Sequence, residues 1–96
     1  MQSDTNMIRK AGRAEGRVQG VGFRVFVRNE ARALGVTGWV KNMSDGSVTM
    51  ELQGDAETIE QLTAKIKAGD NWIRVKSLEL TDLPVVEGEK DFAVRY

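Results

Sequence analysis

Apolar positions recur at helical spacing in two stretches of this 96-residue chain. The first stretch predicts a helix that begins near Phe23 and ends at Gly35, with one apolar face made of Phe23, Phe26, Val27, Ala31 and Leu34. The second predicts a helix with Asp55 as its N-cap residue, Gly69 as its stop, and a buried stripe of Ile59, Leu62 and Ile66.

Strand patterns fill most of the remaining chain. Residues 48–53 alternate apolar and polar side chains, which indicates a half-buried strand, and residues 36–43 form a second candidate. The turn residues 44–46 between them predict a hairpin. Residues 72–83 and 92–96 are rich in strand-forming residues. Residues 7–15 are a weaker candidate, because Ala11, Gly12 and Ala14 have low strand propensity.

This order of elements is βαββαβ with a short final strand. It predicts an α+β, ferredoxin-like sandwich, in which both helices lie on one face of an antiparallel sheet. We expect a single domain over residues 7–96 and a disordered tail over residues 1–6. The fold alone says little about function, because many unrelated activities use it.

Composition narrows the possible chemistry. Lysines and arginines equal aspartates and glutamates in number, so the net charge is zero and nucleic-acid binding is disfavoured. The chain contains no cysteine and no histidine, which rules out thiolate nucleophiles and removes the commonest metal ligand and general base. We therefore expect neither a metal site nor a cofactor. With no apolar stretch long enough to span a bilayer and no signal-peptide pattern, a cytoplasmic protein is expected.

A glycine-rich loop over residues 16–22 runs into the first predicted helix and places Arg24 in the first helical turn. Backbone N–H groups of such a loop can converge on an oxyanion, and the helix dipole adds partial positive charge. The planar guanidinium of Arg24 suits two phosphate oxygens at once. The pattern indicates a pocket for a phosphoryl group, although a tight strand-to-helix turn followed by a surface arginine would give the same residues.

Three other glycine motifs fit less well. A dinucleotide fingerprint requires a third glycine where Val25 stands, and a nucleoside-triphosphate loop requires a Gly-Lys-Ser/Thr run that is absent. The run 19–26 resembles an RNA-recognition signature, but Gln19 replaces its leading basic residue, Val21 its aromatic residue and Arg24 an apolar residue.

Two motifs in the correct order resemble the signatures of the acylphosphatase family. Residues 16–24 (Gly-Arg-Val-Gln-Gly-Val-Gly-Phe-Arg) resemble the first, and residues 38–42 (Gly-Trp-Val-Lys-Asn), followed by 46–48 and Gly54, resemble the second. The ending, residues 92–96, is also typical of the family. Two features depart from it: the small residues of the first strand, and the absence of a proline in the turn over residues 69–72.

The resemblance implies hydrolysis of a carboxylic–phosphoric anhydride to a carboxylate and inorganic phosphate. It assigns binding of the phosphoryl group to Arg24 and to the loop amides, and positioning of the attacking water to Asn42. The amides are those of Arg17, Val18, Gln19, Gly20, Val21 and Gly22. We also expect a monomer with a small-molecule substrate, no membrane partner, no cofactor, and inorganic phosphate as both product and competitive inhibitor.

The implied chemistry needs neither histidine nor cysteine. Phosphoryl transfer depends mainly on positioning and charge stabilisation, and a carboxylate leaves without protonation. A neutral asparagine can hold a water without repelling a phosphoryl dianion. A non-catalytic phosphate-binding module on the same fold is the alternative. It would need Arg24 but not Asn42, and release of phosphate from a simple acyl phosphate separates the two.

Overall fold

The computed structural model describes residues 6–96 and confirms the predicted order of elements. The elements are β1 (Met7–Arg17), α1 (Phe23–Ala33), β2 (Thr37–Asn42), β3 (Val48–Asp55), α2 (Ala56–Ala68), β4 (Arg74–Leu83) and β5 (Phe92–Arg95). The tail expected over residues 1–6 lies outside the described residues, apart from Asn6. Within residues 6–96, neither helix is long and apolar enough to cross a membrane.

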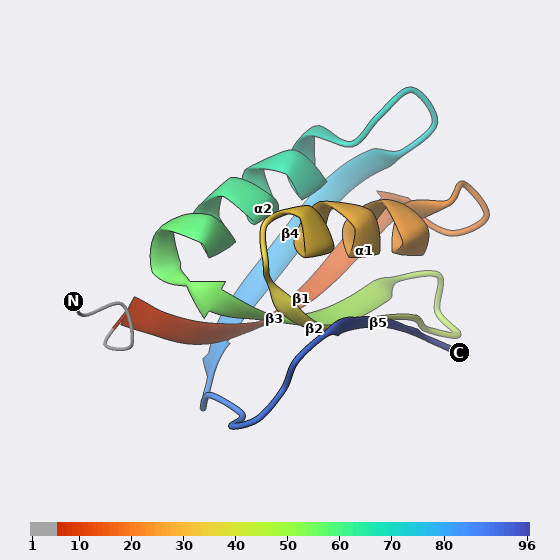
Figure 1. Ribbon diagram of the computed structural model, residues 1–96. Helices are drawn as coiled ribbons and strands as arrows, with labels where there is room; N and C mark the ends of the chain where they lie inside the picture. Colours follow the sequence, from red (N-terminus) through yellow and green to blue (C-terminus); the bar gives the residue numbers. More distant parts are fainter. Residues whose placement is uncertain (1–5) are drawn as a thin grey trace.

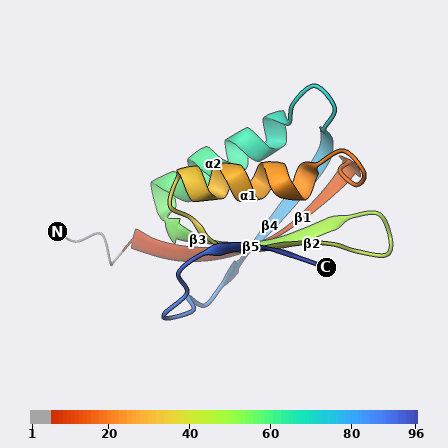
Figure 2. The same ribbon diagram turned by 45° about the vertical axis from the view of Figure 1, so that its right-hand side comes forward.

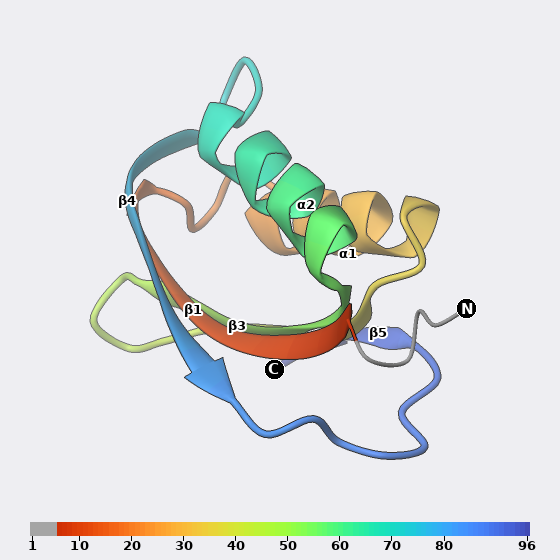
Figure 3. The same ribbon diagram turned by 90° about the vertical axis from the view of Figure 1, so that its left-hand side faces the viewer.

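The strands form one five-stranded sheet in the order β4-β1-β3-β2-β5. Both helices cover one face of it, as predicted (Figure 1). The pairs β1–β3, β1–β4 and β2–β3 are antiparallel, whereas β5 runs parallel to β2, so the sheet is mixed. The β4–β5 connection crosses below the opposite face of the sheet to bring β5 to the far edge (Figure 3).

The apolar stripes predicted for the helices form the core between helices and sheet. In α1 the buried residues are Phe23, Val27 and Ala31, and in α2 they include Ile59, Leu62 and Ile66. They pack against strand residues such as Val40, Met50 and Leu52. Asp55 is the N-cap residue of α2, as predicted, but its side chain forms no capping hydrogen bond. The sequence therefore predicted where the helix begins, but not how its first N–H groups are bonded.

The small residues of β1 make room for larger neighbours. A Cβ at Gly12 would lie 3.0 Å from Cγ of Met50 and 3.2 Å from a methyl carbon of Leu80. The low strand propensity of this segment is outweighed by its pairing with strands on both sides, β3 and β4. The resulting strand runs to Arg17, two residues beyond the range predicted from propensity.

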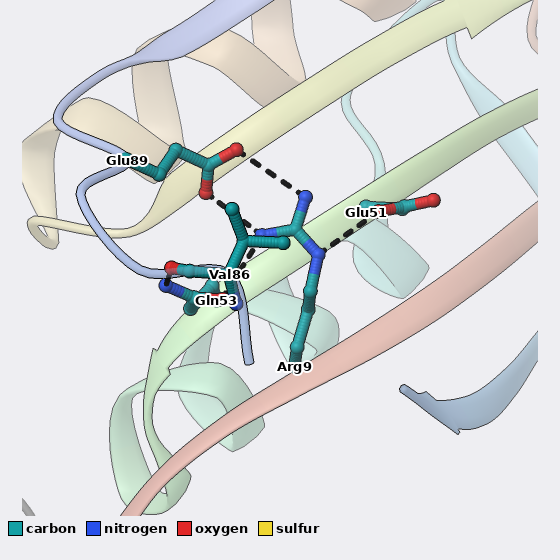
Figure 4. A network of polar contacts seen from close by, with 5 residues as sticks. All are labelled: Arg9, Glu51, Gln53, Val86 and Glu89. Carbon is teal, nitrogen blue, oxygen red and sulfur yellow. Dashed lines mark hydrogen bonds and ion pairs between the residues drawn. The ribbon is translucent and has the colours of Figure 1, made fainter. Parts of the chain in front are cut away.

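A buried arginine fastens the β4–β5 connection to the open face of the sheet (Figure 4). Arg9 on β1, 3% exposed, bonds to Glu51 at 2.9 Å, to Gln53 at 3.0 Å and to Glu89 at 2.8 Å. Gln53 in turn makes two 2.8 Å hydrogen bonds with the backbone of Val86. These contacts position the segment that leads into β5.

Three segments that are distant in sequence meet at one end of the molecule. The β1–α1 loop, the β2–β3 turn and the last residues of the chain all lie at the right-hand end in Figures 1 and 2. Antiparallel pairing of β2 with β3 and parallel pairing of β5 with β2 produce this arrangement. The candidate site is at this end.

Candidate active site

The loop between β1 and α1 is fixed at both ends by buried side chains. Val18 and Phe23 are each 1% exposed and belong to the core. Between them, Gly20 (φ 75°) and Gly22 (φ 80°) adopt left-handed conformations that residues with a Cβ rarely take. The chain can therefore curl tightly while remaining attached to the core.

The loop ends at the N-terminus of α1. Gly22 is the N-cap residue, and its carbonyl oxygen accepts a hydrogen bond from the Phe26 N–H at 3.0 Å. The first helical N–H groups have no partner within the helix, and the first turn contains no acidic residue that would neutralise their partial positive charge. This end of the helix favours an anion.

Arg24 and Asn42 line the same small pocket, of about 130 Å³. Loop and helix residues complete its lining: Val18, Gly20, Gly22, Phe23 and Val25. A water molecule occupies about 30 Å³ of the liquid, so the pocket admits a group of a few heavy atoms. The two side chains that sequence reasoning singled out thus share one compartment, although they lie on different elements.

Asn42 is the last residue of β2 and pairs with the buried Val48 of β3. Its Oδ1 is buried and has no hydrogen-bond partner within residues 6–96. A buried polar atom left without a partner costs about 1–3 kcal/mol, and native structures rarely keep one without a reason. Asn42 lines the pocket beside Arg24, so a residue whose side-chain oxygen lacks a hydrogen-bond partner stands at the pocket wall.

Arg24 is held by the last two residues of the chain. Its Nη1 donates a hydrogen bond to the Arg95 carbonyl oxygen at 3.0 Å, and its guanidinium lies over the ring of Tyr96. Arg95 itself lies over the ring of Trp39 on β2, with Cζ 4.6 Å from the ring centroid. The parallel β2–β5 pair thus carries the contacts that orient the arginine.

Gln19 ties the loop to the hairpin that carries Asn42. Its Nε2 donates to the carbonyl oxygens of Met43 at 2.7 Å and Ser47 at 2.9 Å. Within the same turn, the hydroxyl and N–H of Ser47 donate to Asp45 and hold the pKa of that carboxyl well below its usual range, with a further contribution from Arg13. The turn is therefore ordered around Asp45, as its sequence predicted.

The residues proposed for the loop amides do not all lie in the same place. Val18, Gly20 and Gly22 line the pocket with Arg24, whereas Gln19 and Val21 are not among its lining residues. Arg17 is the last residue of β1, opposite Arg74 of β4, and lines a different pocket. Sequence reasoning missed the Gln19 side chain and the Arg95–Tyr96 contacts, and no local motif signals either.

The fold and the pocket define a ferredoxin-like α/β protein with a loop, a helix N-terminus and an arginine converging on one small cavity. The family model described as Acylphosphatase matches residues 10–94. An acylphosphatase of Clostridium beijerinckii is 42% identical over 90 residues, which cover 94% of this chain and 100% of that protein.

Solved structures agree in fold and in sequence. The acylphosphatase of Coxiella burnetii has a TM-score of 0.89 and 37% identity and covers 99% of each chain. That of Bacillus subtilis has a TM-score of 0.88 and 34% identity, covering 93% of this chain and 99% of the other. The chain belongs to the acylphosphatase family and is an enzyme that hydrolyses acyl phosphates.

Proposed function

We propose that the phosphoryl group of the substrate binds in the pocket shared by Arg24 and Asn42, and that Asn42 positions the attacking water. The observation that carries this proposal is that Asn42, whose buried Oδ1 has no hydrogen-bond partner within residues 6–96, lines the same 130 Å³ pocket as Arg24. The loop amides of residues 17–22 and the N-terminus of α1 complete the cradle.

Binding of the phosphoryl group follows from the charges around the pocket. The guanidinium of Arg24 presents a planar set of donors that matches two phosphate oxygens. Its contacts with Arg95 and Tyr96 restrict its rotamers before the substrate arrives, which lowers the entropy cost of binding. Backbone N–H groups of the loop supply further donors without adding a mobile side chain.

The water is held by an uncharged residue. Oδ1 of Asn42 accepts a hydrogen bond from the water and directs an oxygen lone pair toward phosphorus. A carboxylate at the same position would also accept the hydrogen bond, but it would repel the dianionic phosphoryl group. Neutrality of this side chain is therefore part of the proposed mechanism.

The reaction needs no side chain of the protein as a general acid or general base. The water oxygen forms a bond to phosphorus while the bond between phosphorus and the acyl oxygen breaks, and the electron pair leaves on the carboxylate. A carboxylic acid has a pKa of about 4, so this leaving group is stable unprotonated at neutral pH. The proton of the water passes to a phosphate oxygen of the substrate, and inorganic phosphate is released.

The proposal also covers inhibition by phosphate, oligomeric state, location and partners. Inorganic phosphate inhibits competitively, because it occupies the same cradle. The enzyme works as a monomer on a small-molecule substrate in the cytoplasm, with neither nucleic acid nor membrane as a partner. Light scattering during size-exclusion chromatography measures the oligomeric state. Inhibition kinetics show whether phosphate competes with the substrate.

Two variants test the division of labour between the catalytic residues. Arg24→Ala should weaken phosphate binding and also lower kcat, because arginines at phosphoryl centres contribute on the order of 10³–10⁵ in rate. Asn42→Ala should leave phosphate affinity nearly intact while lowering kcat by about 10²–10³. The measurements are kcat with a simple acyl phosphate and calorimetric binding of inorganic phosphate.

Conservative variants serve as matched controls. Arg24→Lys keeps the charge but loses the planar fork, so it should remain impaired. Asn42→Asp keeps the acceptor but adds charge, so its phosphate affinity should fall where that of Asn42→Ala does not. Circular dichroism checks that each variant folds. Equal loss of phosphate affinity in Arg24→Ala and Asn42→Ala, or near-normal turnover of Asn42→Ala, would contradict the proposal.

A further inference from the structure

A second pocket, of about 390 Å³, opens beside the strand end that leads into the loop. It is formed where the end of β1, the end of α2 and the start of β4 meet, and four of its lining residues are basic: Arg17, Lys67, Arg74 and Lys76. We call it the basic pocket. It shares no lining residue with the pocket of Arg24 and Asn42.

The four cations of the basic pocket are exposed and uncompensated. Within residues 6–96, none of them takes part in an ion pair, and the same is true of Arg24, Arg28, Lys41, Lys90 and Arg95. The acidic residues that flank these segments in sequence are engaged in other contacts. Glu15 pairs with Arg13, and Asp70 accepts hydrogen bonds from the backbone N–H groups of Trp72 and Ile73. A chain with zero net charge thus concentrates positive charge at one place.

The backbone forces two of these cations together. Arg17 lies directly opposite Arg74 in the antiparallel β1–β4 pair, after a register shift between Glu15 and Gly16. Like charges in directly opposed positions of a sheet are destabilising. A neutral residue at either position would avoid this repulsion. An anion between the two arginines would turn this repulsion into two attractive contacts.

We propose that the basic pocket is a second anion site, and that it takes a small anion carrying several phosphate groups. Two guanidinium groups offer planar donors to phosphate oxygens, and two ammonium groups add point charges around them. Its volume is three times that of the Arg24 pocket, which suits an oligophosphate better than a single phosphate. The site shares no side chain with the mechanism proposed above, although the backbone amide of Arg17 belongs to the proposed phosphoryl cradle.

Titration with tripolyphosphate locates the site. We expect amide signals of Gly16, Ala68 and Val75 to shift in heteronuclear NMR spectra of the full chain, and to shift in Arg24→Ala as well. Added salt should weaken this binding, because exposed charges are screened. Shifts confined to Gly20 and Gly22 would place the anion in the loop pocket and overturn the proposal. Loss of the Gly16, Ala68 and Val75 shifts in Arg24→Ala would overturn it as well.

A charge-matched pair of double variants tests specificity. The double variant Lys67→Gln/Lys76→Gln should bind tripolyphosphate roughly threefold to thirtyfold more weakly, because it loses two exposed charge contacts. Lys41→Gln with Lys90→Gln removes the same charge from exposed positions outside the pocket and should change it less than about twofold. Hydrolysis of a simple acyl phosphate should be unchanged in both. Equal weakening in the two double variants would show a response to overall charge and contradict the site.

Discussion

The guanidinium of Arg24 lies over the aromatic ring of Tyr96, with Cζ 4.7 Å from the ring centroid. The neighbouring Arg95 carbonyl oxygen accepts a hydrogen bond from the same guanidinium at 3.0 Å. A cation above an aromatic face at an exposed site gains about 0.5–1 kcal/mol. The tyrosine is itself 90% exposed, so little else in the fold accounts for its position.

Tyr96→Ala should therefore raise the inhibition constant of phosphate and lower kcat/KM by roughly twofold to fivefold, since the arginine gains rotamer freedom. Tyr96→Phe keeps the ring face and should behave as wild type. Steady-state kinetics with an acyl phosphate and phosphate inhibition measure both. Wild-type behaviour of Tyr96→Ala, or equal loss in Tyr96→Phe, would rule out a role for the ring.

Gly20→Ala should weaken phosphate binding, and Gly35→Ala offers a matched control. Both glycines have nearly the same positive φ, 75° and 73°, and an added Cβ at either meets nothing within 4 Å. The cost of each substitution is therefore backbone strain of about 1–2 kcal/mol and not crowding. We expect similar losses in the free energy of unfolding, measured in urea.

The two glycine variants should differ at the site. Gly20→Ala shifts the loop toward negative φ and should reduce calorimetric phosphate affinity, whereas Gly35→Ala, at the end of α1, should not. Unchanged affinity in Gly20→Ala would mean that the loop backbone does not hold the anion.

The helices and strands could be predicted from the sequence because the pattern of apolar residues follows which side chains are buried. This holds for the helical stripes and for the alternation over residues 48–53. Arg24 and Asn42 could be predicted as site residues because short motifs carry them. The strand order was not predicted, because the spacing of apolar residues along a strand does not indicate which strands become neighbours in the sheet. The contacts of Gln19 with the β2–β3 turn and of Arg24 with β5 depend on that order, and so does the meeting of Arg17 with Arg74.

Hydrolysis should continue at full rate in excess chelator. The proposed cradle already supplies positive charge through Arg24, the loop amides and the N-terminus of α1. Initial rates with an acyl phosphate, before and after dialysis against a chelator, measure this. Loss of turnover that is restored by adding a divalent metal would contradict the mechanism.

Glu89→Gln should destabilise the protein at neutral pH by about 1–3 kcal/mol, because Arg9 loses a charged partner at a largely buried position. Burial raises the pKa of Glu89, but hydrogen bonding and attraction to Arg9 outweigh it, so the pKa lies below its ordinary value. A lowered pKa in the folded state gives stability that is present above the unfolded pKa, about 4.3, and is lost as pH falls.

The difference between wild type and Glu89→Gln should accordingly be full at pH 7 and shrink below about pH 4. Urea unfolding at both values measures it. Glu87→Gln, an exposed neighbour in the same connection, should change stability little at either pH. A difference that persists unchanged in acid would indicate that the glutamate acts through packing and not through its charge.

The parallel pairing of β5 with β2 has a consequence for synthesis. Arg24 and its carbonyl partner on β5 are 71 positions apart, and contacts of such long range form late in folding. A ribosome makes the loop, Arg24 and Asn42 before it makes β5, which carries a hydrogen-bond partner of the arginine. A nascent chain that has left the ribosome only as far as β4 already contains Arg24 and Asn42, yet it lacks β5, which carries a hydrogen-bond partner of the arginine. Release of β5 is therefore the step at which the guanidinium of Arg24 gains its hydrogen bond to the Arg95 carbonyl oxygen, and we expect full activity only after that step.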